Sequence, residues 1–443
     1  MKFKIETEFQ ETEIGKIPKN WKVVRLKEIA LEIKSGFASG KRDDVNGVVH
    51  LRMFNIGLDG ILTFDEVVKV PKPEDWKQYL LEYGDILLVN TSGSEEHIGK
   101  VAFFEKSDMK CTYSNHLTRI RINRSLTDPK WIYFVLYYLW YKGYFRTFIH
   151  QQAGGQRNIP LKTIENIPVI LPPYNEVKRL VKILTSLQFT SKKVNEAINK
   201  LTALKKALMR ELLTGRIRVN EENGKLVFHR ETEFQETKIG KIPREWEVVS
   251  IRDSFELYKG TTPSTKNNKY WGGSIPFVTP TDITAINDLN KIYLTKTEKY
   301  LTKEGVQSRN LRIIPAGSLL FTSRATIGYL AINSVEVTIN QGVIALIPKR
   351  NDINVLFYYY YLINMRRRFE ELSGGSTYKE ISMSTFSRTT IPQPSSIEQK
   401  KIAEILLTID KAIGLHYEEK VRLNRLRRGL MNLLLTGKIR VLE

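Results

Sequence analysis

Short loops rich in amide, guanidinium and hydroxyl groups are the parts of this sequence best suited to chemistry. Residues 150–158 combine three glutamines, an arginine and an asparagine with a pair of glycines. Such side chains can form paired hydrogen bonds with the base edges of DNA, and glycine lets backbone approach phosphate. Residues 373–379, with a second pair of glycines, occupy the same place later in the chain. Both loops therefore suit a DNA-reading surface.

Two further pairs of loops have the same character. Residues 34–42 correspond in position to residues 259–269, and both are basic and rich in hydroxyl groups. Residues 91–94 and 323–326 follow short apolar runs, where a loop can face a duplex. For any single residue a solvated loop is an equally good interpretation, but the net charge favours contact for the set. The DNA-binding candidates are Lys34, Ser35, Lys41, Arg42, Thr91, Ser92, Ser94, His116, Gln151, Gln152, Gln156, Arg157, Asn158, Lys259, Thr261, Thr262, Lys266, Asn268, Lys269, Arg324, Thr326, Gln341, Ser376, Tyr378 and Lys379.

The overall charge indicates a polyanionic partner. The 443 residues carry a formal charge of +21, and a hydrophobic content of 42% supplies core material for two to four domains. Double-stranded DNA is the first candidate and an anionic membrane surface the second. A membrane-bound helix needs a broad apolar face, whereas the long apolar stripes described below are narrow. No apolar run approaches the length of a membrane span, so we expect a cytoplasmic protein without a membrane partner.

Several segments resemble known catalytic motifs but lack residues that those motifs require. Residues 93–101 resemble a phosphate-binding loop, yet five residues separate the glycines and Val101 replaces the hydroxyl that binds magnesium. Leu171 precedes Pro172-Pro173-Tyr174 where amino-methyltransferases need a polar side chain for the target amine. The six histidines are scattered without metal-binding spacing, so His50, His97 and His150 are interpreted as ordinary surface or core residues. A lone cysteine, Cys111, excludes a disulfide framework and a cysteine-based zinc module. We therefore expect no catalytic residue, no metal site and no cofactor in this chain.

An internal repeat organises the chain. Residues 6–24 return as residues 231–249 with 15 of 19 positions identical, and residues 208–219 return as residues 430–441. Trp21 and Trp246 lie at matching places in the repeat and are interpreted as core anchors. Because the first closing segment runs into the second copy, the equivalent tail, residues 436–443, should lie close to residues 1–20.

Two long helices are predicted, one in each copy. Residues 175–213 carry an apolar stripe at alternating spacings of three and four, broken at Ser191 and Lys205, and a second stripe begins at Gln399. This spacing is typical of a coiled-coil seam, and each helix would be roughly 55 Å long. The expected interhelix seam consists of Leu180, Leu184, Leu187, Val194, Ile198, Leu201, Leu208, Ile402, Leu406, Ile409, Ile413, Leu423 and Leu430.

Each copy also contains a mixed body of helices and strands. Apolar runs at 84–89 and 317–321 predict strands, and the tyrosine-rich segments around Tyr137 and Tyr360 predict helices. Residues 35–80 and 258–310 align poorly, so the frame is duplicated while other segments differ. A protein that binds two different targets would show this pattern.

These features resemble the specificity subunits of type I restriction-modification systems. The resemblance rests on residues 14–21 and their repeat at 239–246, on residues 172–176 and 394–399 that open the long helices, and on the Leu-Leu-Thr-Gly segments at 212–215 and 434–437. It covers essentially the whole chain. One departure is Val177, where the family pattern and the second copy have glutamine (Gln399).

The resemblance implies an α/β (α+β) fold with two similar target recognition domains separated by two long antiparallel coiled-coil helices in a pseudo-twofold repeat. The implied parts are recognition domain 1 (1–173), helix 1 (174–214), recognition domain 2 (215–394), helix 2 (395–436) and a tail (437–443) packed near the N-terminus. Each domain would read one half of a bipartite DNA site, while the helices set the spacer and dock two methyltransferase subunits. Restriction subunits would join them. S-adenosylmethionine would then belong to the methyltransferase subunits, and ATP and magnesium to the restriction subunits.

Two alternatives remain at this stage. A self-contained DNA-modifying enzyme would need a cofactor or metal site, which the sequence does not reveal. A basic DNA-binding scaffold without sequence preference would bind through salt-sensitive contacts alone. Half-sites about one duplex turn apart, roughly 34 Å, can be bridged by domains on helices of the expected length. Because the two copies differ in their loops, the expected target is asymmetric.

Overall fold

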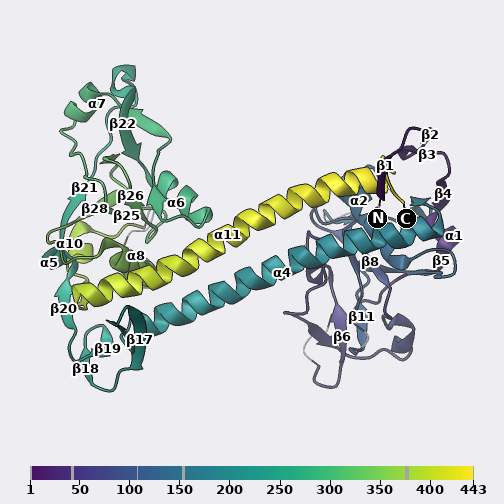
Figure 1. The fold of residues 1–443 in the computed structure, drawn as a ribbon, viewed down its shortest axis with the longest axis horizontal. Coiled ribbons are helices and arrows are strands. Elements are labelled where there is room, and N and C mark those ends of the chain that lie inside the picture. Colours follow the sequence, from purple (N-terminus) through teal and green to yellow (C-terminus); the bar gives the residue numbers. More distant parts are fainter. Residues whose placement is uncertain (1, 41–43, 107, 152–154, 375–378, 443) are drawn as a thin grey trace. The chain divides into compact units, whose positions relative to one another are not determined.

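The computed structural model describes residues 2–40, 44–106, 108–151, 155–374 and 379–442. The chain forms two compact units: residues 1–193 with 421–443 make unit 1, and residues 194–420 make unit 2. Two long helices, α4 (Tyr174–Leu212) and α11 (Ser396–Leu435), each contribute residues to both units (Figure 1). The chain thus folds into two helix-and-strand bodies joined by two long helices, as the sequence predicted.

Unit 1 contains the first copy's body and the tail of the second. Its strands are β1 (Lys2–Ile5), β2 (Phe9–Thr12), β3 (Gly15–Pro18), β4 (Lys22–Arg25), β5 (Ala30–Ser35), β6 (Val48–Leu51), β7 (Val68–Val70), β8 (Ile86–Val89), β9 (Thr91–Ser92), β10 (Val101–Phe103), β11 (Cys111–Tyr113), β12 (Leu117–Ile122), β13 (His150–Gln151), β14 (Arg157–Asn158), β15 (Pro168–Leu171) and β30 (Ile439–Leu442). Its shorter helices are α1 (Leu26–Ile29), η1 (Met53–Asn55), η2 (Trp76–Tyr79), α2 (Pro129–Tyr141), η3 (Tyr144–Phe148) and α3 (Leu161–Glu165).

Unit 2 repeats this plan with different insertions. Its strands are β16 (Ile217–Glu222), β17 (Lys225–Arg230), β18 (Phe234–Thr237), β19 (Gly240–Pro243), β20 (Glu247–Ser250), β21 (Phe255–Lys259), β22 (Trp271–Val278), β23 (Tyr293–Leu294), β24 (Lys299–Leu301), β25 (Leu319–Thr322), β26 (Leu330–Asn333), β27 (Thr338–Ile339), β28 (Val343–Pro348) and β29 (Thr390–Gln393). Its shorter helices are α5 (Ile251–Ser254), η4 (Asn268–Tyr270), α6 (Pro280–Asp288), α7 (Lys303–Gln307), α8 (Val355–Asn364), α9 (Arg366–Glu371) and α10 (Met383–Ser387).

At the centre of each unit lies a β-sheet whose strand order differs from the order of the strands along the chain. The strand order is β10-β8-β12-β5 in unit 1 and β21-β28-β25-β26-β23 in unit 2, so four strands correspond and unit 2 adds β23. All four residues of β8 are buried. Ile86 and Leu88 face one hydrophobic core, while Leu87 and Val89 face another. An unbroken apolar strand is therefore explained by a sheet that is covered on both faces.

The ends of the long helices belong to the domain cores. Leu180 and Leu184 of α4 and Leu434 of α11 pack into the core of unit 1 with Trp21, and Leu212, Ile402 and Leu406 pack into the core of unit 2 with Trp246. Trp21 and Trp246 are each 1% exposed, which confirms that they are core anchors. Every residue of the expected interhelix seam is buried or half-buried.

Two charged residues within the apolar stripes, Lys205 and Arg427, have a structural explanation. Lys205 forms an ion pair of 2.6 Å with Asp410, which accepts a hydrogen bond of 2.7 Å from the Tyr360 hydroxyl on α8. In unit 1 the corresponding Arg427 stacks on the ring of Tyr137 on α2, with 4.5 Å from the guanidinium carbon to the ring centroid. Charged residues in the stripe thus attach each aromatic helix to a long helix. Burial, with Asp410 adding to it, raises the pKa of Tyr360.

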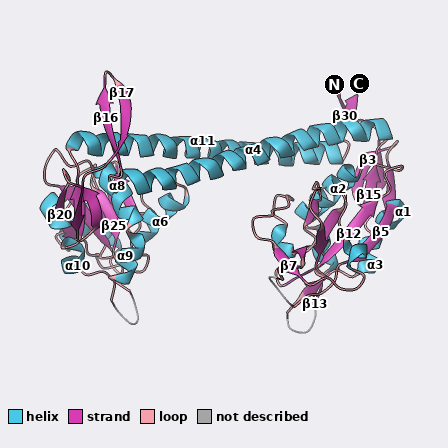
Figure 2. Cartoon of the chain, turned by 90° about the horizontal axis from the view of Figure 1, so that it is seen from below, coloured by secondary structure: helices cyan, strands magenta, loops and turns pink. Residues whose placement is uncertain are grey.

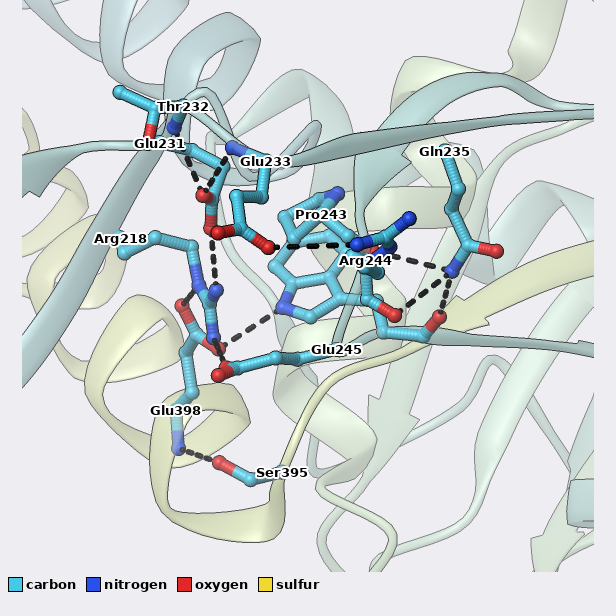
Figure 3. Close-up of polar contacts among 11 residues, drawn as sticks. Arg218, Glu231, Thr232, Glu233, Gln235, Pro243, Arg244, Glu245, Ser395 and Glu398 are labelled. Carbon is cyan, nitrogen blue, oxygen red and sulfur yellow. Dashed lines mark hydrogen bonds and ion pairs between the residues drawn. The ribbon is translucent and has the colours of Figure 1, made fainter.

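Each copy's tail completes the body of the other copy. In unit 2, Arg218 of β16 forms ion pairs with Glu398 of α11 at 2.7 Å and with Glu231 at 2.6 Å, and the Trp246 indole donates to Glu398 at 3.0 Å (Figure 3). In unit 1, Arg440 of β30 pairs in the same way with Glu176 at 2.6 Å, and the Trp21 indole donates to Glu176 at 3.2 Å.

The strands that carry these arginines are paired equivalently. β30 pairs antiparallel with β1, matching Lys2 with Leu442, and β16 pairs with β17 in the same register. The two termini therefore lie side by side, and the proximity expected from the repeat is confirmed. Figure 2 shows the hairpin β16–β17 in unit 2 and β30 beside the marked termini in unit 1.

The departure at Val177 leaves the helix start unchanged. α4 begins two residues before Glu176 and α11 begins two residues before Glu398. Val177 is buried in the core of unit 1, whereas Gln399 accepts a hydrogen bond from the Asn354 amide at 2.9 Å. The second copy has a polar contact where the first has an apolar one.

Candidate nucleic-acid interface

In unit 1 the candidate loops meet at one end of the central sheet. β14 lies between β13 and β9, with Arg157 opposite Ser92 and Asn158 opposite Thr91. The Thr91 hydroxyl donates to the Asn158 side-chain oxygen at 3.1 Å, and the Arg157 guanidinium donates to the Gly93 carbonyl at 2.6 Å. Figure 2 shows β13 on the side of unit 1 away from the long helices. The structure therefore brings two loops together that are separate in the sequence.

Asn90 connects this loop pair to the others, although the sequence did not single it out. Its side-chain amide donates to the Thr118 hydroxyl at 3.0 Å, to the Asn115 carbonyl at 3.1 Å and to the Ser35 hydroxyl at 3.5 Å. Its backbone amide donates to the His116 carbonyl at 3.0 Å. An asparagine directly after the buried strand β8 was the available signal. Asn90 is a positioning residue for the surface because it is itself buried.

The loop after β5 needs a glycine at its first position. A Cβ on Gly36 would lie 2.1 Å from the Tyr113 carbonyl oxygen, and a Cβ on the equivalent Gly260 in unit 2 would lie 1.9 Å from the Ile339 carbonyl oxygen. Both loops therefore approach a neighbouring strand too closely for a side chain. Both copies therefore have glycine at this position, although the residues that follow it differ between the copies.

The side chains of the unit 1 candidates are in different environments. Lys34 contacts Gln78 and lies 5.0 Å from the ring centroid of Tyr79. Ser94 and Gln156 are exposed, while Ser92 is buried and its hydroxyl accepts from the Ser94 amide at 3.1 Å. Ser92 therefore stabilises the conformation of the loop that follows β9. Lys41, Arg42 and Gln152 lie outside the described residues, and Gln151 is described only as part of β13.

In unit 2 a corresponding surface follows β21, β25 and β27. Lys259 pairs with Glu380, and the Thr262 hydroxyl donates to the Gln341 side-chain oxygen. The backbone of Glu380 also bridges to Arg324. The loops around residues 262, 324, 341 and 380 therefore lie together, through contacts unlike those of unit 1.

The remaining unit 2 candidates are mostly solvent-exposed. Lys266, Lys269 and Lys379 make no ion pair with another described residue. Thr261, Asn268 and Thr326 are also exposed, while Ser376 and Tyr378 lie outside the described residues. Exposed lysines without carboxylate partners suit contact with phosphate.

A buried histidine lies beneath the unit 1 surface. His50 is 1% exposed, its ring centroid lies 4.5 Å from that of Phe37, and its Nδ1 lies 3.0 Å from the Thr112 hydroxyl. Burial, assisted by the Arg52 charge, lowers the pKa of His50 to about 4. His50 is therefore neutral near pH 7 and acts as a core residue, as the sequence suggested.

Among the described residues, histidine, cysteine and carboxylate side chains do not cluster in any group of three that could bind a metal ion. Within the same residues, helices long and apolar enough to cross a membrane are absent.

Comparison with known proteins identifies the family. The family model described as "Type I restriction modification DNA specificity domain" matches residues 18–203 and again residues 243–425. The chain belongs to this specificity family. The two matches correspond to the two copies of the internal repeat.

One relative from this specificity family matches along the full chain, and another matches part of it at higher identity. The putative type I restriction enzyme MjaX specificity subunit of Methanocaldococcus jannaschii is 30% identical over 444 residues, covering 100% of this chain and 99% of its own. The MjaIX specificity subunit of the same organism is 44% identical over 187 residues, 42% of this chain and 43% of its own.

Solved structures support the fold of the specificity family. The crystal structure of the type I restriction-modification S subunit from M. genitalium has a TM-score of 0.58 at 12% identity and covers 94% of this chain and 96% of its own. A chain from a structural study of type I R-M complex assembly has a TM-score of 0.52 at 17% identity, covering 95% and 99%. These likenesses show the fold of two duplicated bodies on long helices.

Proposed function

We propose that this chain is the DNA specificity subunit of a type I restriction-modification complex and has no catalytic activity of its own. Each recognition domain binds one half of an asymmetric, bipartite site in double-stranded DNA, while α4 and α11 set the length of the spacer. The proposed boundaries are 1–173 and 215–394 for the domains, 174–214 and 395–436 for the helices, and 437–443 for the tail.

The observation that carries this proposal is a conserved frame with two unlike reading surfaces. Arg218 and Arg440 make matching contacts in the two copies. Between the matching strands both units contribute two strands to a three-stranded sheet, β6 and β7 or β22 and β24, but unit 1 adds only η1 and η2, whereas unit 2 adds η4, α6, β23 and α7. A frame that stays constant while its exposed insertions differ fits two readers of different sequences.

The partners and cofactors follow from the same proposal. Two methyltransferase subunits dock on the long helices and use S-adenosylmethionine to methylate adenine. Restriction subunits, which require ATP and magnesium, join to form the nuclease. The relatives are named as specificity subunits of type I restriction enzymes, which supports this division of labour. The complex would act on DNA in the cytoplasm.

Co-expression with candidate methyltransferase subunits, followed by mapping of methylated adenines in host DNA, tests the proposal. We expect methylation at one bipartite motif, and no methylation from either partner alone. Methylation by the purified chain itself would instead support a self-contained enzyme.

A sequence-indifferent scaffold is distinguished by binding measurements. A specific reader loses about 1–3 kcal/mol of binding free energy for one changed base pair within a half-site. A scaffold would show the same strong salt dependence but the same affinity for every sequence.

A further inference from the structure

A groove between α4 and the body of unit 1 has no role in the reading surface described above. It consists of two adjoining hollows of about 320 Å³ and 550 Å³ that share Phe103, Lys130 and Thr185. We call this feature the α4 groove. The Thr185 hydroxyl oxygen is buried without a hydrogen-bond partner among the described residues.

The α4 groove lies at the end of the sheet opposite the reading loops. Tyr83 and Gly84 precede β8, Arg124 follows β12, and Phe103 ends β10, whereas the reading loops follow β8 and precede β12. The length of β8 separates the two ends, and at about 3.3 Å per residue this is roughly 13 Å. The groove is therefore not part of the reading loops, and its exposed aromatic side chains favour a protein partner.

The α4 groove is lined by five cationic side chains, by aromatic rings and by two carboxylates, of which Glu105 already pairs with Lys130 at 2.5 Å. Lys106 lies 4.4 Å from the ring centroid of Phe64, and Lys130 lies 5.3 Å from that of Phe103. Lys182 and Lys192 line the groove from α4. Among the described residues, Lys106, Lys182 and Lys192 make no ion pair with a carboxylate. A carboxylate-rich partner would supply the missing charges.

Exposed rings on α4 supply apolar contact area along the same helix. Phe189 lines one hollow and is 59% exposed, and Tyr174 lines the other and is 48% exposed. From Tyr174 to Lys192 the helix rises about 27 Å, which equals about five turns of a partner helix. Alternating acidic and apolar positions on such a helix match the groove.

The second copy lacks this chemistry. With Glu176 matched to Glu398, α11 has Glu404 in place of Lys182, Lys411 in place of Phe189 and Gly414 in place of Lys192. Glu404 reverses the charge and contacts Lys401 at 3.7 Å. The α4 groove is therefore a property of the first copy and not of the duplicated frame.

We infer that the α4 groove binds an acidic, amphipathic helix of one methyltransferase subunit, and that the two methyltransferase subunits consequently bind this chain with unequal strength. The inference rests on the proposed function and adds an asymmetry to it. The subunit beside the first copy gains contacts with Lys182, Phe189 and Lys192, and the subunit beside the second copy does not.

The test uses the full chain with the double substitution K182E/F189K, which gives α4 the residue types of α11. Both side chains point outward, so the fold is retained. The control K225E/F228K makes the same changes of residue type at exposed positions of β17, away from the long helices and the reading loops. Native mass spectrometry and titration with the purified methyltransferase subunit measure stoichiometry and affinity.

We expect two bound methyltransferase subunits on the unaltered chain and the control, and one site weakened by at least roughly 10-fold in K182E/F189K. DNA binding by the chain and its melting temperature should be unchanged. Equal binding in all three proteins, equal losses in variant and control, or loss of the restriction subunit alone would overturn the inference. Absence of methyltransferase binding to the unaltered chain would overturn the proposed docking itself.

Discussion

At the scale of single residues, a few buried charged and polar groups hold the frame. Glu398 is 2% exposed and accepts hydrogen bonds from both the Arg218 guanidinium and the Trp246 indole. Glu245 also pairs with Arg218, at 3.0 Å, but its side chain is 79% exposed. The same arginine thus has one buried and one solvated carboxylate partner.

Glu398→Gln should lower the free energy of unfolding of unit 2 by roughly 3 kcal/mol, because it leaves part of the Arg218 charge uncompensated in a buried site. The matched change Glu245→Gln should cost less than about 1 kcal/mol, since water screens that ion pair. Chemical denaturation followed by tryptophan fluorescence measures both. Similar effects for the two variants would contradict the assigned role of Glu398.

His50 gives unit 1 a specific sensitivity to acid. The unfolded chain binds a proton at this residue near pH 6.5, whereas the folded chain does not until about pH 4. Lowering the pH through this window therefore reduces the free energy of unfolding, by up to roughly 3 kcal/mol once the pH is below about 4. Above pH 6.5 the residue adds no pH dependence.

His50→Gln should remove this part of the acid sensitivity while exposed His229→Gln should not. Urea denaturation of the three proteins at pH 7 and pH 4.5 provides the comparison. An unchanged difference between the two pH values in His50→Gln would show that another group is responsible.

At the scale of elements, the Leu-Leu-Thr-Gly segments end the long helices against the opposite copy. Gly437 has φ of +67°, and a Cβ there would lie 2.3 Å from Cγ of Pro18; Gly215 has φ of +68° and meets Pro243 in the same way. The glycine is needed both for the left-handed turn and for close packing.

Gly437→Ala should destabilise unit 1 by at least about 2 kcal/mol, from backbone strain and overlap with Pro18. Gly429→Ala is the matched control, because Gly429 lies within α11 with no atom within 4 Å of the added Cβ. That change should stabilise the helix by about 1 kcal/mol. Thermal unfolding would contradict the account if Gly437→Ala were neutral.

The elements also show what the sequence could and could not predict. The repeat and the stripe spacing predicted the long helices, the core tryptophans and the pairing of the termini, because these depend on periodicity and identity. The contacts of Lys205 and Arg427 could not be predicted, because their partners Tyr360 and Tyr137 lie on helices that are far away in the sequence.

The candidate surface was predicted only as a set of loops. Loop position after a buried strand indicated residues 91–94, but the pairing of Arg157 with Ser92 depends on tertiary folding. For the same reason the sequence included Ser92, which is buried, and omitted Asn90, which organises four loop contacts. Contact of the exposed candidates with DNA stays a prediction.

At the scale of the whole molecule, the closing strand of each copy pairs with the opening strand of the other copy. In unit 2 a turn at Asn223 and Gly224 connects β16 to β17, while in unit 1 the equivalent strands β30 and β1 end in the two termini. The same strand pair is thus covalently connected in unit 2 and not in unit 1.

Moving the opening to Asn223–Gly224 should preserve the fold and the DNA target. In unit 2, residues 221–226 connect Asn220 to Val227, the positions equivalent to Leu442 and Lys2. Glu443 and Met1 plus about four added residues therefore suffice to join the old termini. With the same partner subunits, the permuted chain and the original chain should direct methylation to the same sites; a changed target would contradict the equivalence of the two strand pairs.

The central claim is that one duplicated frame presents two unlike readers to DNA, and selection of bound duplexes from a random pool tests it most directly. We expect an enriched motif of two different half-sites separated by a spacer of fixed length and unspecified sequence. A palindrome, a single contiguous motif or a pool without enrichment would contradict it.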